Sequence, residues 1–210
     1  MKHNRNQGFT LVEILFVIGL MGFIGLAIIS FERNMIASSR LLREQLETQQ
    51  QIRRLFKEFE GEMRTMAPSQ AGAYPIAEAT SSSITFFSDY DKDGVRERIR
   101  YFYATSTKSI RKGVIEPSGA GTTTYTLANE VFSDRVINLD TSATTTPIFQ
   151  YYNSSYDGVA TNTPLTSPIN IPDVRHIKML IYVRVPSQKG STTPLMFQTQ
   201  VTPRNIKDNL

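Results

Sequence analysis

The hydrophobic and polar residues divide the chain into an apolar stretch, an amphipathic stretch and a longer region of short alternating patterns. No charged residue occurs over residues 14–31, where Ile, Leu, Val, Phe and Gly predominate. About 20 apolar residues at ~1.5 Å each span the ~30 Å hydrocarbon core of a bilayer. This stretch therefore predicts a transmembrane helix over about residues 14–31.

The helical pattern continues through residues 32–66, which contain no proline and are rich in Glu, Arg, Gln and Leu. Apolar side chains recur there at steps of three and four residues, which places them on one helix face. They are Ile52, Leu55, Phe56, Phe59, Met63 and Met66. One helix over residues 9–66, here called the stalk, would reach on the order of 85 Å. Its first half is predicted to be transmembrane and its second half amphipathic.

Residues 67–210, here called the head, have a different character, because all ten prolines lie at or beyond Pro68. Period-two patterns in this region predict short strands. The candidate strands are residues 83–88, 96–104, 108–115, 148–152, 174–185 and 195–202. Stretches rich in Ser, Thr, Gly and Pro predict long surface loops over residues 117–124 and 154–172. The predicted fold class is α+β, with the long helical stalk packed on a mostly antiparallel β-sheet head.

Composition excludes several classes of functional site. The chain has no cysteine, which excludes disulfide scaffolds, thiol nucleophiles and cysteine-ligated zinc. It has only two histidines, His3 and His176, and His176 falls between basic neighbours on the polar side of its strand. An anchored enzyme would need a cluster of polar residues, and the acidic loop described below is the one candidate. The chain is therefore predicted to be non-enzymatic.

The junction before the apolar stretch carries a specific motif. Residues 1–8 are short, polar and basic, and Lys2 and Arg5 favour a cytoplasmic location for this end. The residues that follow the leader are Gly8, Phe9, Thr10, Leu11, Val12 and Glu13. This junction resembles the class III signal of type IV pilins and of the pseudopilins of type II secretion. The resemblance implies that prepilin peptidase cleaves between Gly8 and Phe9 and methylates the new amino terminus of Phe9.

A competing interpretation is a secretory signal that is cleaved after the apolar stretch. Gly25, Leu26 and Ala27 offer a loose small-residue pattern for such a cut. That cut would leave the charged amphipathic segment without its anchor. A cut after Gly8 instead keeps the apolar stretch on the mature protein and lowers the net charge from +4 to +2, because Lys2 and Arg5 are lost.

Glu13 is a lone carboxylate beside the apolar stretch, where burial in lipid costs about 2.5–3.5 kcal/mol on insertion scales. Cleavage creates an ammonium group at Phe9, which shares a helix face with Glu13. In the family, the equivalent acidic residue is thought to pair with the terminus of a neighbouring subunit and to set the assembly register. The alternative is that Glu13 is hydrated near the lipid headgroups.

Three glycines at steps of three, Gly19, Gly22 and Gly25, suit close helix packing or reflect the ordinary tolerance of membrane helices for glycine. One departure from many pilins is that no proline occurs around Ser30. A proline-dependent melted segment is therefore not expected.

An acidic loop lies between the first two candidate strands. Carboxylates alternate there before Gly94, as at the opening of a calcium loop. The candidate calcium ligands are Asp89, Asp91, Asp93 and Glu97. The loop is not an EF-hand, because its twelfth position is Arg100 where that motif has Glu. The competing interpretation is a polar hairpin turn without an ion; calcium is the one possible cofactor.

Basic residues suggest an alternative function. Arg96, Arg98 and Arg100 share one strand face, and Lys108, Arg111 and Lys112 follow. Such a face would contact DNA phosphates in a minor pilin that acts in DNA uptake or adhesion. The favoured interpretation is a solvated strand face, since a net charge of +4 is too small to indicate a nucleic-acid partner.

The head resembles the larger minor pseudopilins of the J type and the minor pilins of the W type. The resemblance rests on residues 84–103, 174–185 and 201–205. It implies a minor subunit of a type II secretion pseudopilus or a type IV pilus, with a place at the filament tip where it primes assembly. The implied partners are prepilin peptidase, other pilins or pseudopilins, the inner-membrane assembly platform and, before assembly, membrane lipid.

The implied location is a single-pass protein of the cytoplasmic membrane, with the amino terminus in the cytoplasm and the head in the periplasm or at the cell surface. The sequence leaves the choice between secretion and pilus open.

Overall fold

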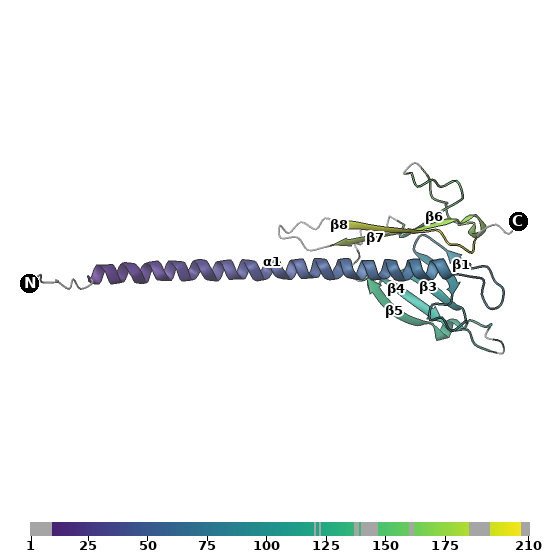
Figure 1. Cartoon of the computed structure of the whole chain (residues 1–210), viewed down its shortest axis with the longest axis horizontal. Helices are drawn as coiled ribbons and strands as arrows, with labels where there is room; N and C mark the ends of the chain where they lie inside the picture. The colour runs from purple at the N-terminus through teal and green to yellow at the C-terminus, as the bar shows by residue number, and fades with distance from the viewer. Residues whose placement is uncertain are drawn as a thin grey trace, which may run out of the picture. The chain divides into compact units, whose positions relative to one another are not determined.

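The computed structural model describes residues 10–119, 121, 123–136, 139, 147–159, 162–184 and 194–206. Within these residues, one long α-helix is followed by two antiparallel sheets (Figure 1). The elements are α1 (Leu11–Thr65), β1 (Ile76–Ala79), β2 (Ser83–Ser88), β3 (Glu97–Ala104), β4 (Ser109–Ile115), η1 (Leu127–Asn129), β5 (Val131–Val136), β6 (Phe149–Tyr152), η3 (Ile171–Asp173), β7 (His176–Arg184) and β8 (Pro194–Val201). The chain divides into two compact units, Met1–Glu44 and Gln45–Leu210, and α1 contributes to both.

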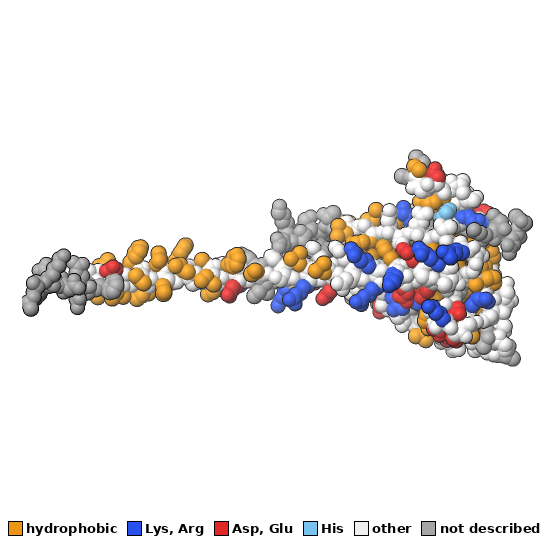
Figure 2. All heavy atoms as spheres, viewed as in Figure 1, with side chains coloured by type: hydrophobic (Ala, Val, Ile, Leu, Met, Phe, Trp, Pro, Cys, Tyr) orange, Lys and Arg blue, Asp and Glu red, His pale blue; other side chains and the backbone are white. Residues whose placement is uncertain are grey.

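The described part of the first unit is the beginning of α1. Thr10 caps this helix, because its Oγ1 accepts a hydrogen bond from the backbone amide of Glu13 at 3.3 Å. The large apolar side chains that follow are exposed, among them Leu11 at 76% and Phe23 at 75%. Figure 2 shows hydrophobic side chains along this part of the helix. By length and composition, α1 is able to cross a membrane here.

The second unit contains both sheets. The larger sheet has the strand order β1-β2-β3-β4-β5, and the smaller one has the order β6-β7-β8. Every neighbouring pair is antiparallel. The two sheets flank the last part of α1 (Figure 1). Apolar side chains of this part of the helix can therefore pack against both sheets.

Phe59 shows how α1 connects the sheets in the core of the second unit. Its side chain is fully buried. Its ring meets that of Tyr101 on β3 edge-on at 5.3 Å and that of Phe149 on β6 at 6.1 Å between centroids. One aromatic side chain of the helix therefore packs against both sheets, a geometry that aromatic pairs favour.

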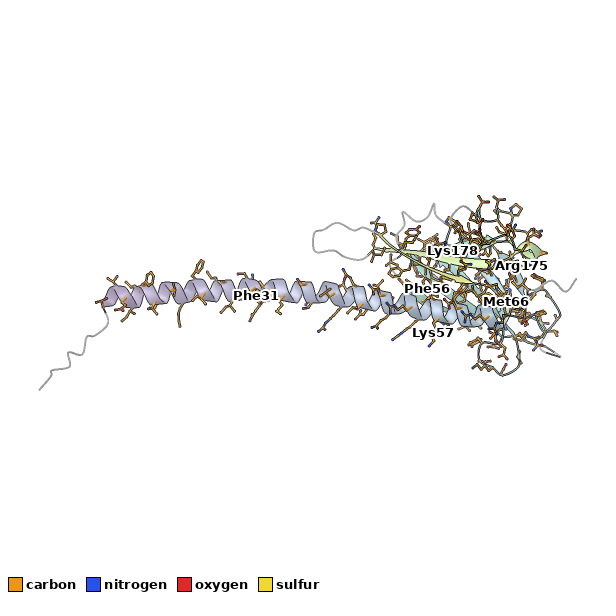
Figure 3. All side chains as sticks on the ribbon, turned by 45° about the horizontal axis from the view of Figure 1, so that its top comes forward. Phe31, Phe56, Lys57, Met66, Arg175 and Lys178 are labelled. Atoms are coloured by element: carbon orange, nitrogen blue, oxygen red, sulfur yellow. The ribbon has the colours of Figure 1, made fainter. Side chains whose placement is uncertain are left out.

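The other apolar residues on the buried face of α1 follow the predicted spacing of three and four residues. The other fully or almost fully buried apolar residues of α1 are Ile52, Leu55 and Met63, and Met66, which directly follows the helix, is fully buried too. Phe56 is partly buried and packs against this core, while Lys57 is exposed on the other side of the helix (Figure 3). The amphipathic second half of the helix is therefore confirmed.

A buried ion-pair cluster joins α1 to the larger sheet. Lys112 on β4 is 1% exposed, and its ammonium group binds the carboxylates of Glu62 and, at 2.9 Å, Glu58. The hydroxyl of Tyr101 donates a hydrogen bond to Oε2 of Glu62 at 2.7 Å, and Arg135 on β5 pairs with Glu58 at 2.8 Å. Burial raises the pKa of Glu62 although Lys112 lies beside it. The cluster thus links four charged side chains, of which Lys112 and Glu62 are buried.

Polar contacts also hold the end of α1. The side-chain amide of Asn205 donates a hydrogen bond to the backbone carbonyl of Met66 at 2.8 Å. The hydroxyl of Ser88 donates to the carbonyl of Glu62 at 3.0 Å, and the amide of Ala67 donates to the carbonyl of Phe87 at 3.0 Å. The last carbonyls of a helix lack partners within it. Here Ser88 on β2 supplies a partner for the carbonyl of Glu62, and Asn205 supplies one for the carbonyl of Met66, just after the helix.

The structure confirms the predicted α+β class and most of the predicted elements. The strand predicted over residues 83–88 has the same limits as β2. Three others begin one residue before β3, β4 and β6, and the strand predicted over residues 195–202 is shifted by one residue from β8. The strand predicted over residues 174–185 is shorter as β7, and Val185 lies outside the described residues. Two strands, β1 and β5, were not predicted. The sequence did not indicate that the described strands divide into two sheets.

Candidate functional site

The acidic loop between β2 and β3 is a compact turn built on its own carboxylates. Oδ2 of Asp89 accepts a hydrogen bond from the amide of Gly94 at 3.1 Å. Oδ1 of Asp93 accepts one from the amide of Val95 at 2.7 Å, and Oδ1 of Asp91 accepts one from the amide of Asp93 at 3.3 Å. Gly94 has a φ of 90°, a conformation that glycine adopts without strain. The alternating Asp residues therefore shape the turn, as the hairpin interpretation expects.

Three of the four candidate calcium ligands come together in this loop. Asp89, Asp91 and Glu97 each offer a carboxylate oxygen, and these oxygens lie within 4.8 Å of one another. Asp93 is not part of that group. Its carboxylate instead accepts the hydrogen bond from the amide of Val95 within the turn. The structure thus brings together the first, second and fourth of the predicted ligands.

Glu97 is the buried member of this group. It begins β3, its side chain is fully buried, and Oε2 accepts a hydrogen bond from the amide of Tyr90 at 3.1 Å. Burial raises the pKa of Glu97 to about 7, and the negative charges of Glu116 and Asp91 act in the same direction. The carboxylate is therefore costly to keep ionised at this position.

Sequence reasoning missed one further acidic residue, Glu116. It follows β4 directly, and its carboxyl group meets that of Glu97 and lies near Asp91 and Asp93. The pairing of Arg98 with Ile115 explains this placement, since one more step of the same hairpin register sets Glu116 opposite Glu97. The position of Glu116 beside Glu97 could have been predicted only from the register of the β3–β4 hairpin.

Three of the six basic residues on the predicted strand face are engaged in ion pairs. Arg100 makes two hydrogen bonds of 2.9 Å with the carboxylate of Glu130, and its guanidinium lies 4.4 Å from the ring centroid of Phe102. Arg111 pairs with Asp134 at 3.0 Å, and Lys112 is buried in the cluster described above. Three of the proposed phosphate contacts are thus neutralised within the chain.

The amino-terminal candidate site lies partly outside the described residues. Gly8 and Phe9, the predicted cleavage and methylation residues, belong to the part that the structure does not describe. Glu13 is exposed in the first turn of α1. A side chain added at Gly19, Gly22 or Gly25 would meet no atom of the chain within 4 Å. The apolar part of α1 thus begins beside one carboxylate, that of Glu13, and its large apolar side chains are exposed.

The comparison with known proteins decides how this helix is classified. Residues 3–29 match the prokaryotic N-terminal methylation motif, and this segment contains Gly8, Phe9 and Glu13. The match indicates the type IV pilin and pseudopilin family. No curated protein and no solved structure matches the chain significantly.

Several properties follow for this pilin-like chain. A class III signal implies processing by prepilin peptidase and assembly with other pilins. Members of the family are typically non-enzymatic structural subunits that are anchored in the membrane before they enter a filament. The long helix packed on antiparallel sheets agrees with a pilin-like α+β fold.

Proposed function

We propose that this chain is a minor pilin or pseudopilin, a structural subunit of a type II secretion pseudopilus or a type IV pilus, which assembles through the first half of α1. The observation that carries the proposal is the exposed apolar surface of this helix. Ile18 and Phe31, at 63% and 68% exposure, are typical of its side chains. Such a surface is stable in lipid or against other apolar helices.

The position of the signal before the helix explains how that surface is retained. Prepilin peptidase would cleave between Gly8 and Phe9 and methylate Phe9, which leaves the whole apolar stretch on the mature protein. The helix then moves from lipid into a bundle of similar helices. Hydrophobic burial changes little in this exchange, so packing and polar contacts select the arrangement.

Glu13 is the polar contact that we assign to assembly register. Its carboxylate is exposed beside Val12, itself 74% exposed, on a helix that enters lipid. The amino terminus of a neighbouring subunit would neutralise this charge, and the low dielectric of the bundle strengthens the pair. A subunit shifted along the bundle would leave both charges unpaired.

The minor subtype and the place at the filament tip rest on the head. Three features of the J and W types support this assignment. They are the strand–acidic turn–strand unit of β2 and β3, the long strand β7, and the terminal segment in which Asn205 binds the end of α1.

Replacement of Glu13 by alanine tests the proposal. A photoreactive amino acid at Val17 should cross-link to another pilin or pseudopilin in the native cells, and E13A should lower that cross-linking at least about tenfold because one buried charge pair is lost. The measurement is the amount of cross-linked product at equal membrane content. Glu32→Ala, on the same helix beyond the apolar stretch, should match the wild type. Equal cross-linking of E13A and wild type would contradict the role of Glu13.

A further inference from the structure

We propose that the loop between β2 and β3 binds a calcium ion through Asp89, Asp91 and Glu97. The oxygens that these residues offer lie within 4.8 Å of one another. Two oxygens that bind one calcium ion at about 2.4 Å lie at most ~4.8 Å apart. The three side chains therefore already satisfy the distance that a shared ion requires. This inference does not depend on the proposed use of the amino-terminal helix.

The buried oxygens provide an independent observation. Oε1 of Glu97 and Oδ1 of Asp89 are both buried, and no hydrogen-bond donor among the described residues reaches either atom. Glu97 as a whole is fully buried. A buried carboxylate without a compensating partner is costly. Two such oxygens in one loop therefore indicate that a positive charge completes the site.

The hydrogen bonds of the loop leave those two oxygens for the ion. Oδ2 of Asp89 is held by the amide of Gly94, and Oε2 of Glu97 is held by the amide of Tyr90. Each carboxylate is thus fixed through one oxygen and offers the other. Asp91 is exposed, so the ion has access from solvent and keeps room for water ligands.

No cationic side chain among the described residues pairs with these three carboxylates. The salt bridges between described residues do not include Asp89, Asp91 or Glu97. The carboxyl of Glu116 also meets that of Glu97 and adds to the negative charge of the loop. Calcium suits the site better than magnesium, because calcium accepts an irregular set of carboxylate and water oxygens, whereas magnesium requires a near-ideal octahedron.

The test uses the full chain in detergent micelles, with near-ultraviolet circular dichroism of tyrosine as the readout of thermal unfolding. Calcium at about a hundredfold excess over its Kd should raise Tm by roughly 5–10 °C relative to a chelator. Asp91→Asn should remove most of this shift. Glu78→Gln, an exposed and equal change of charge on β1 of the same sheet, should retain it.

Glu97→Gln separates ion binding from folding. It removes a buried negative charge that has no cation beside it, so without calcium this variant should be at least as stable as the wild type, and its Tm should not respond to calcium. The proposal is overturned by any of three results: no shift of the wild type with calcium, an equal shift with magnesium, or a full shift in Asp91→Asn.

Discussion

Replacement of Lys112 by methionine is expected to lower the free energy of unfolding of the second unit by about 3–5 kcal/mol. The substitution keeps much of the side-chain volume but removes the ammonium group that binds Glu62 and Glu58. Glu58 retains Arg135, whereas Glu62, itself 7% exposed, is left as a buried charge without a cation. Urea unfolding followed by tyrosine circular dichroism measures the effect, since all nine tyrosines lie at or beyond Tyr74.

The loss of unfolding free energy in K112M should increase as pH rises. Burial already raises the pKa of Glu62 above its ordinary value of 4.5, and removal of Lys112 removes the main influence that lowers it. A carboxyl group whose pKa is raised in the folded state loses stability as pH rises above its unfolded pKa. The deficit of K112M should therefore be small near pH 4 and grow toward neutral pH.

A double variant is the control for this prediction. Glu62→Gln in the K112M background removes the uncompensated charge and keeps an acceptor for the hydroxyl of Tyr101. It should recover most of the lost stability, because replacing a whole buried ion pair is often close to neutral. If the free energy of unfolding of K112M alone lies within about 0.5 kcal/mol of the wild-type value, the cluster does not contribute to stability as described.

Phe59→Ala is expected to lower the free energy of unfolding of the second unit by about 3–5 kcal/mol. The ring is fully buried and packs on Tyr101 of one sheet and Phe149 of the other. Its removal leaves a cavity at the place where α1 meets both sheets. The same urea experiment measures this loss. The urea concentration at the midpoint of unfolding should fall, while the dependence of the unfolding free energy on urea concentration should change little.

The matched control lies on the same helix. Leu46 is 57% exposed, so Leu46→Ala removes a side chain of similar character without opening a cavity. It should change the free energy of unfolding by less than about 0.5 kcal/mol. Similar losses for Phe59→Ala and Leu46→Ala would contradict the assignment of the core to the face of α1 that carries Phe59.

The sequence predicted those elements whose signal is local. The face of α1 that carries Phe59 repeats at helical spacing, and β2 and β7 combine β-branched or aromatic residues with buried positions. The strand β1 is only four residues long, and most of β5 is exposed or half-buried, so neither has a clear apolar alternation. Both were missed because pairing with a neighbouring strand, and not their own pattern, defines them.

The candidate sites show the same division. Asp89, Asp91 and Glu97 meet within one hairpin, so their spacing was sufficient to suggest a common site. Glu116 was not recognised, and Lys112 was assigned to a basic strand face, because the surroundings of each depend on residues far away in the sequence. Lys112 resembles a solvated strand residue until α1 supplies Glu58 and Glu62, about 50 residues earlier.

The amino terminus of the mature protein is the most direct test of the central claim, which is that the apolar helix survives processing and serves in assembly. The full chain would be extracted from membranes of cells that contain prepilin peptidase and analysed by intact mass and amino-terminal sequencing. The account predicts a chain that begins with N-methylated Phe9. A chain that begins after Ala27, or one that retains residues 1–8, would contradict it.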